Sequence, residues 1–425
     1  MKAIISEKNP TLLIMLFPLL YILMPRPSID GVQFLTYPFL GIVAFTVIAL
    51  NIRIIKLSRN LLYLLSLTYL LIFSLLVSMI FSENPELILF FYVVKPFLFS
   101  IILIFGFVVG ERCDYNSIRK GLLRCAYVIL IVQIIVGIPQ LFSLTLFNPI
   151  YSAEMARPIG EKIRIVGTMG NPNIFAWVVI QSSVIIFLME ESKVKQVFGL
   201  LLGFILVILS GSRTALILLP FVILACSFLM SKKDVKFYIF KIPMYTLTLI
   251  FSFYIIIKLI EKYGSYLPYL NQLLQIIDTG KLSSINSFEA RTFMWDNAWN
   301  EFVASESLIK WLFGIGLGFF KFIDSDIIYS IVSYGIVGTA LNLLIYFSLL
   351  LMFSKVKQRQ FSVLGKQYIL FSLIIGYQAE TLSGWNYPLL IMFYAGVAIS
   401  LIKNQSVLLA QNGTKDKLSD NKLAV

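Results

Sequence analysis

Long apolar segments separated by short polar or basic segments make up most of this 425-residue chain. A helix needs roughly 20 apolar residues to cross a bilayer, and segments of about that length recur along the sequence. Membrane-spanning strands would alternate apolar and polar residues, and these segments do not. The pattern predicts an all-α, polytopic membrane protein with about twelve transmembrane helices, at residues 10–24, 32–50, 61–81, 87–109, 122–142, 173–189, 197–211, 213–230, 242–260, 327–353, 366–380 and 387–402. We expect one transmembrane domain over residues 1–403 and a disordered, polar tail over 404–425.

One apolar stretch contains a single charge. Residues 197–230 carry only Arg213, within the sequence Ser-Gly-Ser-Arg-Thr. A charge at membrane depth costs several kcal/mol unless it reaches water or an anion, and the stretch is too long for one crossing. We therefore predict two helices joined by a tight Ser-Gly-Ser-Arg turn, which would place Arg213 at one membrane face.

The basic residues follow the predicted topology. The chain has 35 Lys and Arg and 22 Asp and Glu, a net charge of +13. With both termini placed in the cytoplasm, most of the Lys and Arg fall in cytoplasmic segments, as the positive-inside rule requires. Because topology explains the basicity, we expect no nucleic-acid partner.

The composition also limits the chemistry. The chain is 59% hydrophobic with a mean hydropathy of +0.87, and it contains no histidine. This excludes histidine-dependent catalysis, haem ligation by histidine and most zinc sites. The acidic residues of the predicted outer loops form no compelling ligand cluster, so we expect neither a metal nor another cofactor. Three cysteines near the predicted cytoplasmic side do not imply a disulfide framework.

Two sizeable loops are predicted on the extracytoplasmic side, at residues 143–172 and 261–326. Loops of this size usually carry function. Within the second, residues 288–303 place Phe288, Thr292, Trp295, Trp299 and Phe302 on one helical face. This spacing predicts an amphipathic helix on the outer surface.

A second helix start is expected beside the Arg213 turn. Residues 167–173 read GTMGNPN, in which Asn171 suits the N-cap and the following proline suits the first helical position. The helix after Ser212 begins on the same face. Helix N-termini bind phosphate readily, and Arg157 and Arg164 lie just before the first one. The sequence predicts a site for a multiply charged anion.

The second loop adds further candidates, which are Arg291, Trp295, the glycines of GIGLG at 314–318, and Asp324 and Asp326. No strand precedes the glycines, so they are not a dinucleotide motif, and we expect them to allow close backbone approach. Structural roles compete with the functional ones. Arginine can snorkel to the interface, tryptophan can anchor there, and aspartate favours any helix start.

These motifs resemble the O-antigen polymerase and ligase superfamily. The resemblance is carried by GTMGNPN at 167–173, SGSRTALI at 210–217, the Arg-Thr-Phe-Met-Trp segment at 291–295, GIGLGFF at 314–320 and DSDIIYSIVSYGIVG at 324–338. It covers about residues 160–345, and the remaining spans match only in hydropathy and number. The resemblance implies transfer of glycans carried on undecaprenyl pyrophosphate at the outer face of the bacterial cytoplasmic membrane.

Two activities occur in this superfamily. Polymerases lengthen lipid-linked repeat units into O-antigen or capsular polysaccharide, and ligases transfer the finished glycan to a lipid A core. The ligase pattern has a histidine at the position that Asp324 occupies here. The absence of histidine favours the polymerase. The ligase and, from a different class, a flippase for lipid-linked oligosaccharides are the alternatives, as is a non-catalytic assembly partner. A chain-length regulator and a flippase are the protein partners that this pathway implies.

The chemistry of this transfer predicts roles for individual residues. Arg213 and Arg291 would clamp the pyrophosphate with help from Arg164, and Asp324 or Asp326 would orient or deprotonate the acceptor hydroxyl. The other candidate substrate-binding residues are Arg157, Asn171, Ser212 and Trp295.

Overall fold

The computed structural model describes residues 10–25, 36–55, 57–80, 87–142, 146–151, 154–159, 161, 163–231, 237–264, 274, 286–316, 325–376 and 386–422. Within these ranges the protein is helical and contains no β-strand, apart from one isolated antiparallel bridge between Arg157 and Arg164. The predicted all-α class is confirmed for this part of the chain.

The described residues of each predicted span fall mainly on one helix. These helices are α2 (Pro10–Leu23), α3 (Thr36–Leu50), α4 (Arg59–Ile80), α5 (Leu87–Arg112), α6 (Tyr115–Leu141), α8 (Pro172–Met189), α9 (Lys193–Ser210), α10 (Arg213–Met230), α11 (Ile242–Tyr263), α15 (Asp326–Lys355), α16 (Arg359–Ile375) and α17 (Asn386–Lys422). Among the described residues, 9 helices are long and apolar enough to cross a membrane. The exceptions are α2, α3 and α16, with 14, 15 and 17 residues. The chain is a membrane protein by this measure, and the count of twelve crossings stays a prediction.

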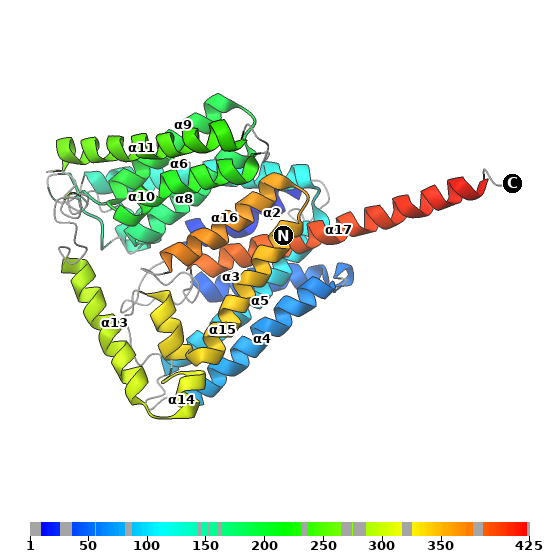
Figure 1. Ribbon diagram of the computed structural model, residues 1–425, viewed down its shortest axis with the longest axis horizontal. Helices are drawn as coiled ribbons and strands as arrows, with labels where there is room; N and C mark the ends of the chain where they lie inside the picture. Colours follow the sequence, from blue (N-terminus) through cyan, green and yellow to red (C-terminus); the bar gives the residue numbers. More distant parts are fainter. Residues whose placement is uncertain are drawn as a thin grey trace.

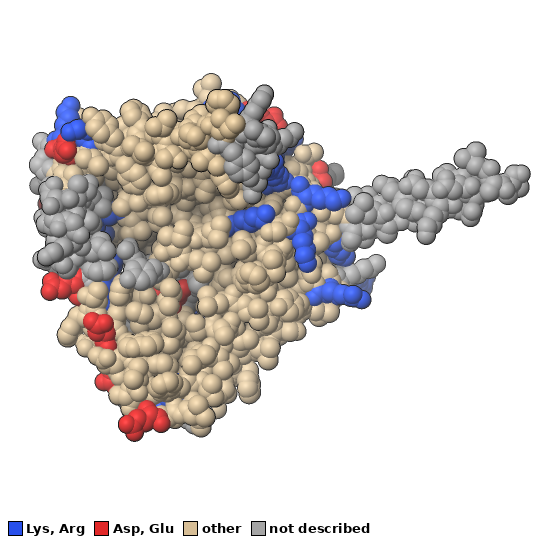
Figure 2. Space-filling model, viewed as in Figure 1, with Lys and Arg blue, Asp and Glu red and all other residues tan. Residues whose placement is uncertain are grey.

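The bundle has two ends that we name by their helices (Figure 1). At the α17 end, Lys403 Nζ lies 2.5 Å from Glu111 Oε2, and Gln405 Nε2 donates to Gln358 Oε1 at 2.7 Å. From here α17 projects away from the bundle, past residue 403 where the transmembrane domain was predicted to end. Disorder of residues 404–425 stays a prediction. At the other end, the α13 end, α13 (Asn286–Ala304) lies across the bundle. Figure 2 shows Lys and Arg mainly towards the α17 end and Asp and Glu mainly towards the α13 end.

Helices α5 and α17 run parallel and in close contact through glycines. A Cβ atom on Gly106 would lie 2.2 Å from Phe393 O, and one on Gly396 would lie 2.1 Å from Leu103 O. Small residues allow helix backbones to approach this closely in membranes. The pair forms a tightly packed centre of the bundle, which any larger residue at these positions would push apart.

Helix α15 is broken at Gly335, where φ is 67° and ψ is −174°. The short helix α14 (Leu308–Phe313) ends against this break, because Ile315 N donates to Val332 O at 2.9 Å. Ser78 Oγ of α4 donates to the next carbonyl, Ser333 O, at 2.7 Å. Carbonyl groups released by the break are therefore paired, as a membrane-embedded backbone requires.

The predicted close backbone approach at the GIGLG segment is confirmed for its first glycine. A Cβ on Gly314 would lie 2.3 Å from Ser333 O, and one on Gly335 would lie 2.4 Å from Gly314 N. The two glycines are thus a matched pair that lets α14 meet the break in α15. Gly318 lies outside the described residues.

The helix predicted at residues 288–303 is present as α13. Among the side chains of α13 that the structure describes, Trp295, Ala298 and Phe302 are buried, whereas Trp299 lies at the edge of this stripe and is 45% exposed. Whether residues 143–172 and 261–326 are extracytoplasmic stays a prediction.

Candidate functional site

The structure contains the tight Ser-Gly-Ser-Arg turn that was predicted from the position of Arg213, and it lies between α9 and α10. Helix α9 ends at Ser210, Gly211 adopts the left-handed conformation with φ 67°, and α10 begins at Arg213. Glycine suits this position because it has no Cβ penalty there. The Arg213 side chain is half-buried at the start of α10.

The start of α8 is held in place by two glutamines of α6. Gln140 Oε1 accepts from Val166 N at 2.9 Å and from Gly167 N at 3.1 Å, and Gln133 Oε1 accepts from Thr168 N at 3.0 Å. Gly167 has φ 51°, and a Cβ there would lie 2.0 Å from Gln133 Oε1. The fold therefore explains the first glycine of the GTMGNPN motif, since only glycine fits at residue 167.

The predicted N-cap of α8 is confirmed. Asn171 Oδ1 accepts from Asn173 N at 2.8 Å and from Ile174 N at 3.4 Å, and a proline follows at the first helical position. Ser212 occupies the N-cap position of α10, but its hydroxyl makes no capping hydrogen bond. Ser212 Oγ instead donates to Asn173 Oδ1 at 2.9 Å. This bond joins the N-termini of α8 and α10 at the α13 end.

Three of the predicted arginines converge on these helix starts. Arg291 of α13 and Arg164 both lie close enough to Arg213 to act on it electrostatically. All three side chains are half-buried. Arg164 is placed by its backbone bridge with Arg157 and by Ile165 N, which donates to Leu209 O at 3.0 Å near the end of α9. The arrangement concentrates guanidinium groups from three separate segments beside two helix N-termini, where an anion is favoured.

Arg157 does not join this group. Its side chain is exposed, and Nη1 donates to Glu154 O and Ala156 O, each at 2.8 Å. The guanidinium therefore binds carbonyls of its own loop, while its backbone positions Arg164.

A cavity of about 40 Å³ opens between the same elements. It brings together the starts of α8, α10 and α17, the end of α16 and the α13 residue Arg291. Its lining residues are Asn173, Trp177, Ile180, Ser212, Thr214, Ala215, Arg291, Phe371, Ile375 and Tyr387. The lining residues carry several hydrogen-bond donor groups, namely one guanidinium, one amide, one indole N–H and three hydroxyls.

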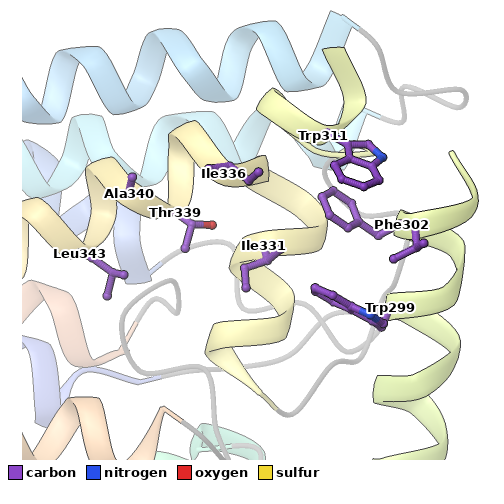
Figure 3. A pocket seen from close by; sticks show the side chains of 9 residues that line it. Trp299, Phe302, Trp311, Ile331, Ile336, Thr339, Ala340 and Leu343 are labelled. Atoms are coloured by element: carbon purple, nitrogen blue, oxygen red, sulfur yellow. The ribbon is translucent and has the colours of Figure 1, made fainter. Parts of the chain in front are cut away.

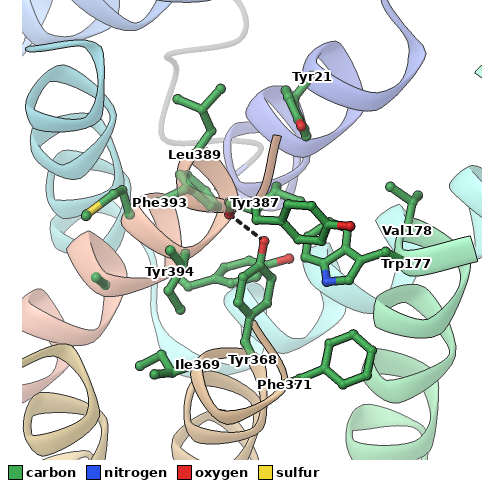
Figure 4. Close-up of a cluster of buried hydrophobic side chains, with 14 of the residues drawn as sticks. Tyr21, Trp177, Val178, Tyr368, Ile369, Phe371, Tyr387, Leu389, Phe393 and Tyr394 are labelled. Carbon is green, nitrogen blue, oxygen red and sulfur yellow. Dashed lines mark hydrogen bonds between the residues drawn. The ribbon is translucent and has the colours of Figure 1, made fainter. Parts of the chain in front are cut away.

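The aromatic side of this cavity belongs to a buried cluster that the sequence did not reveal (Figure 4). Trp177 meets Tyr387 edge-on at a centroid distance of 4.5 Å and Tyr368 at 5.0 Å. Tyr368 Oη donates to Tyr387 O at 2.7 Å, which ties α16 to the first turn of α17. The sequence offered only one signal, a tryptophan one helical turn after Asn173. Nothing local pointed to Tyr387 or Tyr368.

Asp326 lies next to this region. It is 1% exposed at the first position of α15, and its backbone N donates to Gly376 O at 2.8 Å. Gly376 directly follows Ile375, which lines the cavity. Tyr346 lies within electrostatic range of the Asp326 carboxylate. Asp324 lies outside the described residues.

Trp295 is 6% exposed and packs within the protein. A second cavity, of about 400 Å³, lies further along α13 between α14 and α15 (Figure 3). Apart from the Thr339 side chain, it is lined by apolar and aromatic residues, namely Trp299, Phe302, Val303, Trp311, Ile331, Ile336, Ala340 and Leu343. None of its lining residues is charged. No cluster of three or more acidic or cysteine side chains suited to a metal occurs in the part of the chain that the structure describes.

Comparison with known proteins does not assign the chain to a family. No protein-family model matches the chain, and no curated protein is significantly similar to it. The resemblance to the O-antigen polymerase and ligase superfamily therefore rests on the short motifs alone.

Proposed function

We propose that this protein polymerises undecaprenyl-pyrophosphate-linked oligosaccharide repeat units into O-antigen or capsular polysaccharide. The observation that carries the proposal is the convergence of Arg164, Arg213 and Arg291 on the joined N-termini of α8 and α10. Guanidinium groups and helix N-termini both favour a doubly charged pyrophosphate. The basic α17 end would face the cytoplasm and the α13 end the outside, which supports placing both termini in the cytoplasm.

The chemistry that fits these groups is a displacement at the anomeric carbon of the donor. The acceptor hydroxyl oxygen forms the new C–O bond, and the bond to pyrophosphate breaks with its electron pair leaving on the phosphate oxygen. Negative charge grows on the leaving group, and fixed cations stabilise it. The hydroxyl proton passes to a carboxylate. The two candidates are Asp326 and Asp324. A single in-line displacement inverts the anomeric centre.

The test is reconstitution of the purified protein with lipid-linked repeat units and no ATP. We expect the units to lengthen, and we expect Arg213→Ala and Arg291→Ala each to slow elongation by about 100-fold or more, as for loss of one transition-state contact. Arg124→Ala is the matched control, because Arg124 is an exposed arginine near the start of α6 at the α17 end. Elongation at normal rates in both site variants would refute the clamp.

The same assay separates the alternatives. A flippase would move the lipid-linked units across the vesicle membrane without lengthening them. A ligase would transfer glycan only when a lipid A core acceptor is supplied. Either result would replace the proposed polymerisation.

A further inference from the structure

The indole N–H of Trp177 is a buried donor without an acceptor among the described residues. Trp177 is 1% exposed. Buried donors are paired in nearly all native structures, and each exception calls for an explanation such as a bound group. Trp177 lines the 40 Å³ cavity that Arg291 also lines, so a ligand in this cavity would supply the missing acceptor.

The ring of Trp177 is not available as a platform for a sugar. Tyr387 and Tyr368 meet it edge-on, at interplanar angles of 72° and 89°. Figure 4 shows the indole beside Tyr387, with Phe371 on its other side. The N–H is the only polar group of the side chain, and it is the part to which a polar ligand would bond.

The cavity is small and lined by donors. A single water needs roughly 10–15 Å³ measured in the same way, so the 40 Å³ present have room for only a few atoms and not for a sugar ring. Thr214 and Arg291 contribute a hydroxyl and a guanidinium group to the same space, whereas the Ser212 hydroxyl already donates to Asn173 Oδ1. The starts of α8 and α10 add the partial positive charge of two helix N-termini. An anionic oxygen group matches this lining in size and charge.

We infer that Trp177 is a substrate-contacting residue, whose indole N–H donates to a phosphoryl oxygen seated in this cavity. The ligand class is the pyrophosphate group of a polyprenyl-linked donor, and the inference rests on the proposed function. Trp177 would fix the position of one phosphoryl group, while the three arginines balance its charge.

The test measures binding by the full-length protein in detergent, with inorganic pyrophosphate and farnesyl pyrophosphate as probes and sulfate as the control anion. Affinity comes from calorimetry and from the rise in unfolding temperature on adding the probe. We expect Trp177→Phe, which keeps an aromatic ring and loses the N–H, to weaken binding of both probes at least about tenfold, as for loss of a hydrogen bond to a charged group. Trp299→Phe is the matched control, since Trp299 lines the separate apolar cavity. Tighter binding of the farnesyl probe than of inorganic pyrophosphate would identify a lipid-linked source.

The outcomes separate the inference from the proposed function. Equal affinity in Trp177→Phe and the parent would overturn the role of Trp177 and leave the arginine clamp standing. A lower unfolding temperature without a change in affinity would assign Trp177 to packing only, which also overturns the inference. Binding of sulfate as tight as pyrophosphate, or no binding by the parent, would count against both.

A second measurement uses the parent chain, so it still tests the inference if Trp177→Phe fails to fold. The parent chain has 5 tryptophans, so a ¹⁵N-indole NMR spectrum should show one signal that moves downfield when pyrophosphate is added. This signal should persist in Trp299→Phe. A spectrum in which no indole signal moves would overturn the inference.

Discussion

Replacing Gly335 by alanine tests the link between the broken helix α15 and the site. The backbone there has φ 67° and ψ −174°, a region that is essentially restricted to glycine and costs other residues about 1–3 kcal/mol. The added Cβ would also lie 2.4 Å from Gly314 N and 2.4 Å from Leu312 O. Both neighbours are backbone atoms, so relieving the clash adds about 1–3 kcal/mol of overpacking. We expect Gly335→Ala to destabilise the protein by about 2–6 kcal/mol.

The assay compares Gly335→Ala with Gly41→Ala in the same detergent. Gly41 lies in α3, and a Cβ there would meet only the end of the Leu98 side chain, at 3.2 Å. Alanine also favours the helix by up to about 1 kcal/mol, so the control should unfold near the parent temperature, whereas Gly335→Ala should unfold several degrees lower. Elongation should also slow in Gly335→Ala, because the first half of α15 begins at Asp326.

If Gly335→Ala unfolds at the parent temperature and elongates glycans at the parent rate, α15 has no glycine-specific break at residue 335. The contact between α14 and α15 would then not position Asp326.

Three further predictions concern the site loop and the α17 end. Arg157→Ala should leave the elongation rate within about threefold of the parent rate, because the Arg157 guanidinium binds carbonyls of its own loop. Arg164→Ala should slow elongation about tenfold or more, because Arg164 lies close to Arg213. Similar losses of rate in both variants would contradict this difference. Burial, and secondarily the nearby Asp114 charge, raises the pKa of Cys113 to about 12, so at pH 8 only about one thiol in ten thousand is ionised, and mass spectrometry should find Cys113 unmodified by N-ethylmaleimide until the protein unfolds. Hydrogen bonding from Ser117 lowers the pKa of the Asp114 carboxyl; a depressed acid stabilises the fold above its unfolded pKa and loses this effect as the pH falls through the folded pKa. Asp114→Ala should therefore cost about 0.5 kcal/mol at pH 7 and nothing at strongly acidic pH, and a cost that does not vary with pH would contradict the capping role.

The sequence predicts those elements near the site that are specified by residues close together in the chain. A single arginine in a long apolar stretch has few solutions, and the turn at Gly211 is the expected one. Asparagine followed by proline specifies a helix start by its own hydrogen bonding, and Asn171 caps α8 as expected. Helix α13 also followed from the spacing of its aromatic residues.

The remaining features depend on contacts between distant segments. Trp177, Phe371 and Tyr387 come together from three helices, and no periodicity within one helix encodes that meeting. Ser212 has the residue type and position of an N-cap, yet its hydroxyl bonds to Asn173 on another helix. Local rules predict the positions of helices, whereas the lining of the cavity depends on how these helices pack.

The close pairing of α5 and α17 has a consequence for biosynthesis. Phe393, which packs against Gly106, is translated about 290 residues later, and at about 5–20 residues per second this delay is about 15–60 s. During this time the bare backbone face of α5 must be sheltered by lipid or by the insertion machinery. Ribosomal stalling or premature termination before α17 would leave a membrane-inserted chain with its central groove open, a state in which quality-control proteases could recognise it.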